Sequence, residues 1–256
     1  MDDAFALLRL QVEWGADEAL ELAPVERLRP VEVRAAPPVQ RPVPAAAPAR
    51  GTPGERALAA AGQAGSLAAL RDALASFDGC ALRDTASNLV FAEGDPAGGT
   101  LIVGEPPGRE EDRGGHPFAG PEGELLDQML GSIGLSRGEL MLTPLLPWRP
   151  PGGRPPSPAE TALCLPFLHR LFGLIRPQRV VLFGGLAVRV LLPAGKNARR
   201  LPRGWVDLSI PGMSCTLPSL ALPGLADMLK NPPLRRDAWA GLRLLRRAID
   251  EGQTRT

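Results

Sequence analysis

The segment TLIVGEPPGREEDRGGHPFAGPEGELLDQML, which covers Thr100–Leu130, carries the pattern that decides the fold. Its first five residues, Thr100–Gly104, are short, apolar or β-branched and lie between glycines, which predicts a buried strand. After a loop rich in Gly and Pro, Pro121 and Glu122 open a helix. The apolar residues of that helix recur at helical spacing: Leu125, Leu126, Met129, Leu130 and Ile133. The segment is therefore predicted to be one strand–loop–helix unit.

The same alternation continues along the rest of the chain. Three more strands are predicted, at Glu139–Leu146, where Pro144 interrupts the pattern, at Arg179–Gly185 and at Met213–Leu220. Helices are predicted after Ser66, from the capping box at Ser157 to about Ile175, after Gly185 and over 233–250. This order predicts a three-layer α/β/α fold with a short, mainly parallel four-stranded sheet. In such sheets ligands bind beyond the carboxyl ends of the strands.

Composition divides the chain into three parts. Residues 1–22 have apolar side chains at helical spacing and are predicted to form a helix, which docks on its own protein or binds a protein partner. Residues 23–64 are rich in Pro and Ala and are predicted to be a semi-extended linker. Residues 65–252 are predicted to form the α/β domain.

Bulk properties restrict the classes of function. The 256 residues are 44% hydrophobic and carry a formal net charge of +1, so any nucleic-acid surface must be local. Three well-separated cysteines argue against a disulfide framework and for a reducing, cytoplasmic location. We expect no signal peptide and no membrane span. A dinucleotide-binding or Walker fingerprint is absent from the loop after Gly104.

Several motifs in order resemble the family-four uracil-DNA glycosylases, which carry an iron–sulfur cluster. The family's G-E-A-P-G motif is matched by Gly104–Gly108, its E-D by Glu111-Asp112, and its G-x-P-F-x-G-x-x-G-x-L-L by Gly115–Leu126. WRPPGGRPPSP, at Trp148–Pro158, resembles the family's C-R-P-P-x-N-R-x-P-x-P. KNPPLRRDAW resembles its R-N-P-x-x-K-R-x-x-W. The resemblance spans roughly residues 66–250.

This resemblance implies excision of uracil from DNA, with the base flipped into a pocket. It implies that Phe118 stacks on the base and that Gly104 and Glu105 line the base site. The family's uracil-reading asparagine falls on Pro144, and its catalytic histidine falls on Gly224. No histidine follows His169, so that loss does not depend on the alignment. The groups that should read uracil and stabilise the leaving base are therefore missing.

Acidic residues remain in the first loop. Glu105, Glu111 and Asp112 are candidate catalytic residues, since a carboxylate can orient water or stabilise a positive sugar. The alternative for these and for neighbouring Glu110 is that they are solvated loop charges. His116 is close to Phe118 in sequence, but a solvated loop histidine is the interpretation that we prefer.

The four cysteines that hold the family's cluster are only half present. Cys80 and Cys164 match two of the positions, whereas Phe77 and Trp148 stand at the other two. Two thiolates cannot complete a Cys₄ site, so we expect no iron–sulfur cluster and no other cofactor or metal.

Local basic residues provide the predicted DNA contact. Four of them gather in one loop: Lys196, Arg199, Arg200 and Arg203. The arginines of the last helix are predicted to be solvated. Three functions stay open: a base-excision enzyme, a catalytically eroded relative that binds DNA or a protein, and an unrelated small-molecule site in the same cleft.

Overall fold

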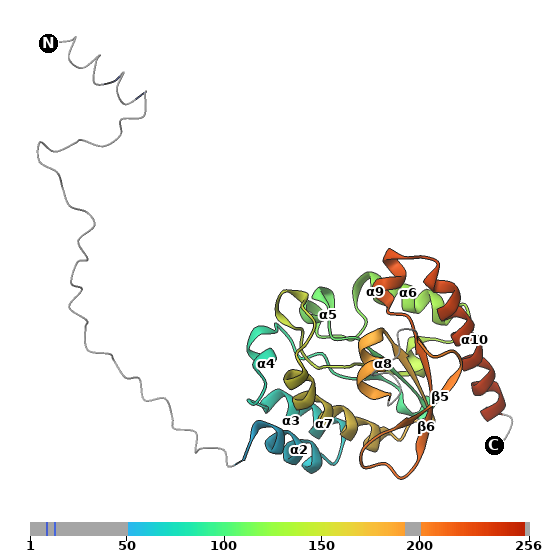
Figure 1. Ribbon diagram of the computed structural model, residues 1–256, viewed down its shortest axis with the longest axis horizontal. Helices are drawn as coiled ribbons and strands as arrows, with labels where there is room; N and C mark the ends of the chain where they lie inside the picture. Colours follow the sequence, from blue (N-terminus) through green and yellow to red (C-terminus); the bar gives the residue numbers. More distant parts are fainter. Residues whose placement is uncertain (1–8, 10–12, 14–50, 193–200, 254–256) are drawn as a thin grey trace, which may run out of the picture. The chain divides into compact units, whose positions relative to one another are not determined.

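The computed structural model describes residues 9, 13, 51–192 and 201–253. The chain divides into a unit over Met1–Pro48 and a compact unit over Ala49–Thr256. Apart from Arg9 and Glu13, the predicted helix at 1–22 lies outside the described residues, and so does most of the predicted linker. The described residues of the compact unit are drawn in colour in Figure 1.

Six strands of the described residues form one sheet, in the order β1-β3-β2-β4-β6-β5. The four inner strands run parallel to one another: β2 (Thr100–Gly104), β3 (Met141–Pro144), β4 (Arg179–Phe183) and β6 (Thr216–Leu222). The two edge strands run antiparallel to their neighbours: β1 (Glu93–Gly94) and β5 (Trp205–Ser209). The prediction of a four-stranded sheet was wrong in number, because it contained the parallel strands and omitted both edges.

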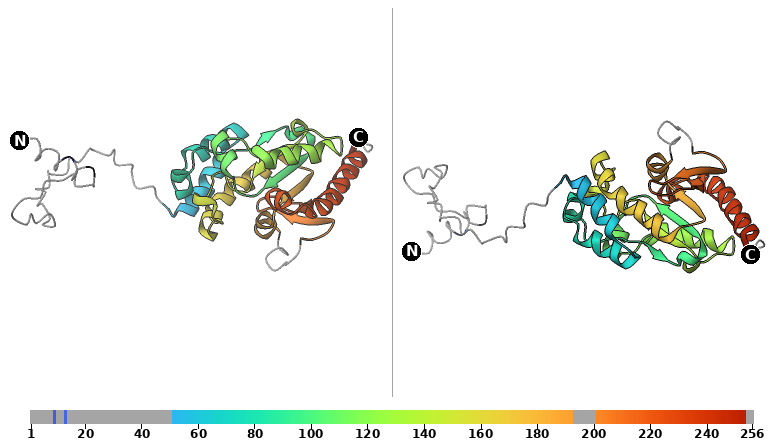
Figure 2. Two further views of the ribbon diagram at one scale, coloured as in Figure 1. Left: turned by 90° about the horizontal axis from the view of Figure 1, so that it is seen from above. Right: turned by 90° about the horizontal axis from the view of Figure 1, so that it is seen from below.

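Helices cover both faces of the sheet, as predicted. Alternate residues of a central strand point to opposite faces: Leu101 and Val103 join one apolar core, whereas Ile102 joins the other. The first core is covered by α2 (Pro53–Gln63), α3 (Leu67–Ser76), α4 (Ala81–Thr85), α7 (Pro158–Ile175) and α8 (Gly185–Leu191). The second is covered by α6 (Gly120–Gly131), α9 (Leu225–Lys230) and α10 (Leu234–Gln253). Figure 2 shows α2, α3 and α7 on one side of the domain and α10 on the other.

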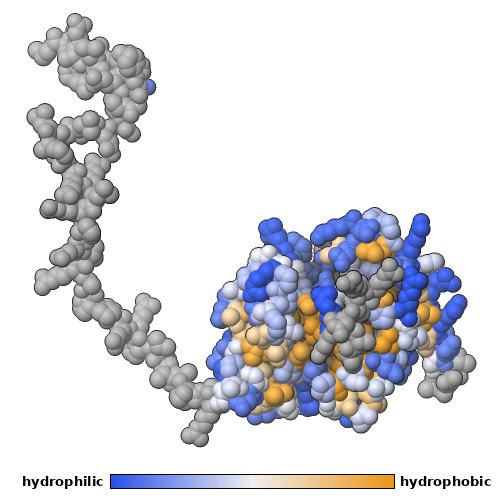
Figure 3. Space-filling view, in the orientation of Figure 1, coloured by the Kyte–Doolittle hydropathy of each residue, from blue (hydrophilic) through white to orange (hydrophobic). Residues whose placement is uncertain are grey.

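Short elements connect these layers. They are α5 (Arg109–Gly114) and the 3₁₀ turns η1 (Pro96–Gly98), η2 (Arg137–Glu139) and η3 (Pro151–Gly153). In the face shown by Figure 3, hydrophobic residues gather across the middle and hydrophilic residues border them. In the described part of the chain, every helix is too short or too polar to cross a membrane.

The last part of the predicted linker at 23–64 is a helix, so this part of the prediction was wrong. Pro53–Gln63 is helical, with Thr52 as its N-cap in a capping box with Glu55. Its small residues Ala57 and Ala61 are buried in the first core, where they allow α2 to pack closely on α7. The alanines that looked like linker composition are therefore the contact face of a helix.

Candidate base-binding site

A small pocket lies where three neighbouring parallel strands end. The last residues of β2 and β3, Gly104 and Pro144, line it together with Phe183 of β4. The remaining lining residues come from the loop after β2, from α5, from the start of α6 and from α9: Glu105, Pro106, Pro107, Glu111, Phe118, Glu122 and Leu225. This is the edge of the sheet at which the alternation of strands and helices predicts a ligand site.

Phe118 forms one wall and is held in a strained conformation. Its φ of +53° is in the left-handed region, which a bulky residue rarely occupies. Arg137 donates from Nη2 to the Phe118 carbonyl at 3.1 Å and also pairs with Asp127. The ring lies against Gly104, where an added Cβ would be 2.7 Å from ring carbon Cζ. The glycine of β2 therefore leaves the space that the aromatic wall fills.

Gly123 keeps the same loop closed. A Cβ at this position would overlap the carbonyl oxygen of Phe118, so no other residue fits without movement of the loop. The family motif therefore has glycine at the position of Gly123 because the Phe118 carbonyl leaves no room for a side chain there.

Glu105 lies between two glycines at the back of the pocket. Its Oε1 accepts a long hydrogen bond of 3.4 Å from the Leu186 backbone N–H. A Cβ on Gly184 would collide with this side chain, and a Cβ on Gly224 would be 3.3 Å from Glu105 Oε2. Burial is the main cause that raises the pKa of Glu105, and the charge of Asp227 adds to it.

Glu111 and Glu122 complete a group of three carboxyls. Glu111 Oε2 accepts a 3.0 Å hydrogen bond from the Gly108 N–H, and burial raises its pKa. Burial, followed by the charges of Glu111 and Glu105, raises the pKa of Glu122 to about 7, although Lys230 acts in the opposite direction. Glu122 was not among the residues proposed from sequence. Its only signal was its place at the first turn of the helix that follows Phe118.

Asp112 is directed away from this group. It is buried, and its Oδ1 accepts hydrogen bonds from the backbone N–H groups of Ser87 at 2.8 Å and Asn88 at 3.4 Å. It does not line the pocket. This placement favours a structural role for Asp112 over the catalytic role considered from the sequence.

The histidines do not replace the missing donor. His116 is largely exposed and pairs through Nδ1 with Glu93 at 2.5 Å. His169 lies on α7, where burial lowers its pKa. Neither residue lines the pocket beside Phe118.

The region of the family's cluster is filled by packing. Cys80 and Cys164 are buried, and the Cys164 thiol, which donates toward Cys80, lowers the pKa of Cys80 to about 7. Phe77 and Trp148 are buried in the same core, and the Phe77 ring meets Phe167 edge-on at 5.3 Å. In the described part of the chain, no three side chains of His, Cys, Asp or Glu are placed to hold a metal. The residues present therefore do not fit the family's iron–sulfur cluster.

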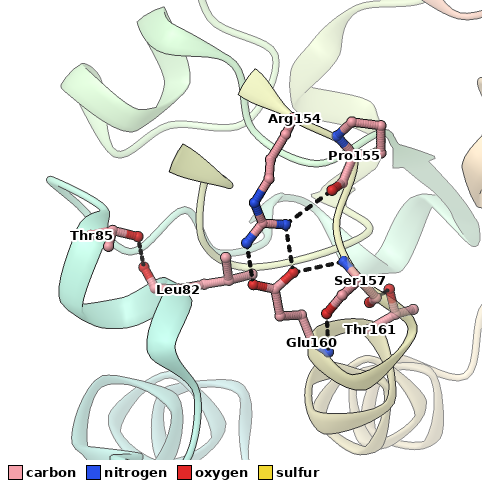
Figure 4. A network of polar contacts seen from close by, with 7 residues as sticks. All are labelled: Leu82, Thr85, Arg154, Pro155, Ser157, Glu160 and Thr161. Atoms are coloured by element: carbon pink, nitrogen blue, oxygen red, sulfur yellow. Dashed lines mark hydrogen bonds and ion pairs between the residues drawn. The ribbon is translucent and has the colours of Figure 1, made fainter. Parts of the chain in front are cut away.

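The loop between Trp148 and α7 is tied to the start of that helix. Arg154 makes two hydrogen bonds to Glu160, from Nη1 at 2.9 Å and Nη2 at 2.5 Å. Glu160 Oε2 accepts from the Ser157 N–H at 2.7 Å, and Ser157 Oγ accepts from the Glu160 N–H at 3.2 Å (Figure 4). The predicted capping box is confirmed.

Of the four residues in the predicted basic cluster, the described residues include Arg203. Lys196, Arg199 and Arg200 lie outside the described residues, and Arg203 is exposed shortly before β5. On α10, Arg236, Arg243 and Arg247 are exposed, and the Arg243 guanidinium lies 5.4 Å from the ring centre of Trp239.

Comparison with known proteins agrees with this geometry. The model of the uracil DNA glycosylase superfamily matches residues 91–243. A type-4 uracil-DNA glycosylase from Pyrobaculum aerophilum is 35% identical over 133 residues, which cover 52% of this chain and 68% of the relative. One from Archaeoglobus fulgidus is 41% identical over 112 residues, 44% of this chain and 56% of the relative.

A further relative, the type-4 uracil-DNA glycosylase of Sulfurisphaera tokodaii, is 38% identical over 120 residues. That alignment covers 46% of this chain and 54% of the relative, so the chain spans little more than half the length of two of these three proteins. The superfamily match covers more than half of the chain, including β2, Phe118 and the first half of α10. The chain therefore belongs to the uracil-DNA glycosylase superfamily, in its type-4 family.

Proposed function

We propose that the chain binds DNA, accepts a base that has turned out of the helix against Phe118, and excises uracil slowly or not at all. The observation that carries this proposal is the aromatic wall at the carboxyl ends of three parallel strands. Stacking on such a wall is worth about 1–3 kcal/mol per base, which offsets a flipping cost of a few kcal/mol.

Slow excision follows from the polar groups that line the pocket. Uracil needs a reader for its edge and a donor for the negative charge that develops on the leaving base. Pro144 has neither a polar side chain nor an N–H, and Gly224 has no side chain. Loss of one placed donor typically costs about 100- to 1000-fold in rate, although such losses are not additive.

The second candidate is a non-catalytic relative that binds DNA or a protein. It is favoured by the fact that Pro144 and Gly224 both remove groups on which the reaction depends. We also propose a cytoplasmic location, because the free thiols Cys80, Cys164 and Cys215 and a DNA ligand fit that compartment.

The test is single-turnover excision with excess protein on single- and double-stranded oligonucleotides that contain one uracil. DNA affinity is measured in parallel at several salt concentrations. Phe118→Ala removes the wall, and Trp205→Ala, an exposed aromatic residue on β5, is the matched control.

We expect little excision, together with salt-dependent binding that prefers a flipped base and that only Phe118→Ala weakens. Rapid excision that depends on Phe118 would overturn the expectation of low activity. Binding that both variants leave unchanged would favour the non-catalytic candidate, with contacts elsewhere on the molecule.

A further inference from the structure

The polar lining of the pocket consists of carboxyl groups alone. Glu105, Glu111 and Glu122 line it, and every other lining side chain is apolar or absent. Among the described residues that line the pocket, none has a side-chain N–H group. Apart from a protonated carboxyl, the lining side chains therefore offer acceptors only.

The three carboxyls come from three separate elements and converge on one cavity. Glu105 follows β2, Glu111 lies on α5 and Glu122 lies on α6. Four charged groups act on Glu122. Two are the other pocket carboxyls, Glu105 and Glu111, and two lie on α9, Asp227 and Lys230. Lys230 does not line the pocket, nor do Arg149 and Arg189, whose charges lower the pKa values of Glu111 and Glu105 respectively.

Burial opposes ionisation of all three carboxyls. It is the first cause that raises the pKa of each, and Glu122 is half-ionised near pH 7. A positively charged ligand in the cavity would oppose this effect, because a nearby opposite charge stabilises the ionised carboxylates that burial has removed from water. A ligand that leaves as an anion would oppose ionisation of the carboxyls further, because it carries charge of the same sign.

Uracil has the wrong chemistry for such a lining. Its O2 and O4 atoms are acceptors, for which the lining side chains hold no N–H donor, and its N3–H is the one group of the base that can donate to a carboxylate. Cleavage of its C1′–N1 bond also leaves an extra electron pair, and hence negative charge, on the base beside the carboxylates. Charge of the same sign in a pocket of low polarity is strongly disfavoured.

We infer that the pocket selects a positively charged, N-alkylated base of DNA in preference to uracil, an inference that rests on the proposed function. Phe118 supplies the face on which the ring stacks, and a cation against an aromatic face gains further stabilisation. The carboxylates accept hydrogen bonds from the amino group of the base and balance its charge.

Excision of such a base needs no oxyanion donor. The bond from C1′ to the ring nitrogen breaks, and both electrons pass to that nitrogen, which cancels the positive charge and releases a neutral base. Water adds to the C1′ cation, and its proton passes to a pocket carboxylate. The carboxylates favour both the cationic substrate and the positive sugar, so the missing histidine is not required.

The test uses oligonucleotides that differ at one position, which holds 3-methylcytosine, cytosine or uracil. Affinity is measured by fluorescence anisotropy, and excision by single-turnover strand analysis with excess full-length protein. Glu122→Gln removes one pocket charge. Glu124→Gln, an exposed residue on the same helix that does not line the pocket, is the matched control.

We expect 3-methylcytosine to bind at least about tenfold more tightly than cytosine or uracil, as one charge-assisted hydrogen bond provides. Phe118→Ala and Glu122→Gln should each remove this preference, and Glu124→Gln should keep it. The preference should rise up to about tenfold between one pH unit below and one above the Glu122 pKa of about 7, as that carboxyl ionises. A merely structural role for Glu122 would not produce this pH profile.

Two other results overturn the inference in distinguishable ways. Phe118-dependent binding that is as tight for uracil as for 3-methylcytosine would leave the proposed function standing and refute the charge selection. Binding with no Phe118-dependent preference for any base would refute the proposed function, and the inference with it.

Discussion

Pro144 and Gly224 are the two residues at which the pocket differs most from its family's pattern. Pro144 ends β3, next to Gly104 of β2. Gly224 is the N-cap residue of α9 and precedes Leu225, which lines the pocket. The backbone of Gly224, with φ −62° and ψ 143°, is one that any residue adopts. Nothing in the backbone at position 224 therefore requires glycine.

We expect the double variant Pro144→Asn, Gly224→His to gain uracil excision. The asparagine supplies a donor and an acceptor, and the histidine supplies a donor for the leaving base. Its Cβ would lie 3.3 Å from Glu105 Oε2 and 3.2 Å from Asp227 Oδ2, contacts that the flexible carboxyl ends can relieve. A gain of about 100-fold or more in single-turnover rate is expected from such a donor.

Gly138→His is the control, since an added Cβ there meets nothing within 4 Å. If the double variant folds yet stays as slow as the parent, the missing donors do not limit the reaction. The carboxyls of the pocket would then be its main obstacle to uracil.

Glu122 carries a second prediction at the level of one residue. Its pKa is higher in the folded chain, about 7, than the ordinary value of 4.5, so its contribution to stability is present below pH 4.5 and lost as pH rises through 7. Glu122→Gln should therefore raise the free energy of unfolding at pH 8 by about 1 kcal/mol, after allowance for solvent screening. At pH 4.5 it should change little.

Denaturant unfolding at both pH values measures this difference, with Glu124→Gln as the comparison. An equal effect of Glu122→Gln at the two pH values would show that Glu122 is not held in a raised-pKa environment.

The sequence predicts some site residues and misses others for a clear reason. Phe118, Gly104 and Glu105 are in one motif, and the structure brings them to one pocket. Glu122 occupies a variable position of that motif, and only the fold shows that its carboxyl faces those of Glu105 and Glu111. Asp112 is adjacent to Glu111 in sequence, but neighbouring residues of α5 point to different sides of the helix.

At the scale of elements, the start of α7 is held by a complete capping box. Ser157 and Glu160 form reciprocal hydrogen bonds, and Arg154 donates two further hydrogen bonds to the Glu160 carboxylate. Ser157→Ala should lower the free energy of unfolding by about 1 kcal/mol, the usual cost of an N-cap. Chemical denaturation checks this value.

The Arg154–Glu160 pair should make part of this stability depend on acid. Hydrogen bonds from Arg154, ahead of those from Ser157, lower the pKa of Glu160 to about 2. Its contribution is therefore present above pH 4.5 and is lost as pH falls toward 2. Glu160→Gln should destabilise the chain at pH 7 and converge with the parent near pH 2. A constant difference across that range would contradict the ion pair.

Elements with strong periodicity could be predicted, and those stabilised by their neighbours could not. The sequences TLIVG and RVVLF could be predicted as β2 and β4 because each is a short run rich in apolar and β-branched residues. All five residues of each strand are buried in the structure. In the edge strand β5, Val206 and Leu208 alternate with Asp207 and Ser209, but this alternation is short and most of the strand is exposed, so its pairing with β6 is what identifies it. Helix α2 had the same Thr/Ser-Pro-x-Glu start as α7, but its alanine-rich contact face resembles a linker.

At the scale of the whole molecule, the sheet separates the aromatic wall of the pocket from the core in which the family holds its cluster. Phe118 belongs to the core on the α6, α9 and α10 side. Cys80, Cys164, Phe77 and Trp148 belong to the core on the other side. Pro144 at the end of β3 lines the pocket beside Phe118 and also a cavity that Cys164 lines, so the two departures from the family meet at the end of this strand.

The core that contains Cys80 and Cys164 should be stable without iron. Trp148 is 2% exposed and Phe77 is 6% exposed, so their rings fill volume that cluster ligands would leave open. We expect the purified protein to contain no stoichiometric iron, to lack the visible absorption of an iron–sulfur cluster and to unfold at the same temperature with and without a chelator. Trp148→Cys should lose about 3–5 kcal/mol of stability, as for other large-to-small core changes, and added iron should not restore it. Cluster absorption in the parent protein, or a melting temperature that falls with chelator, would show instead that the protein holds iron.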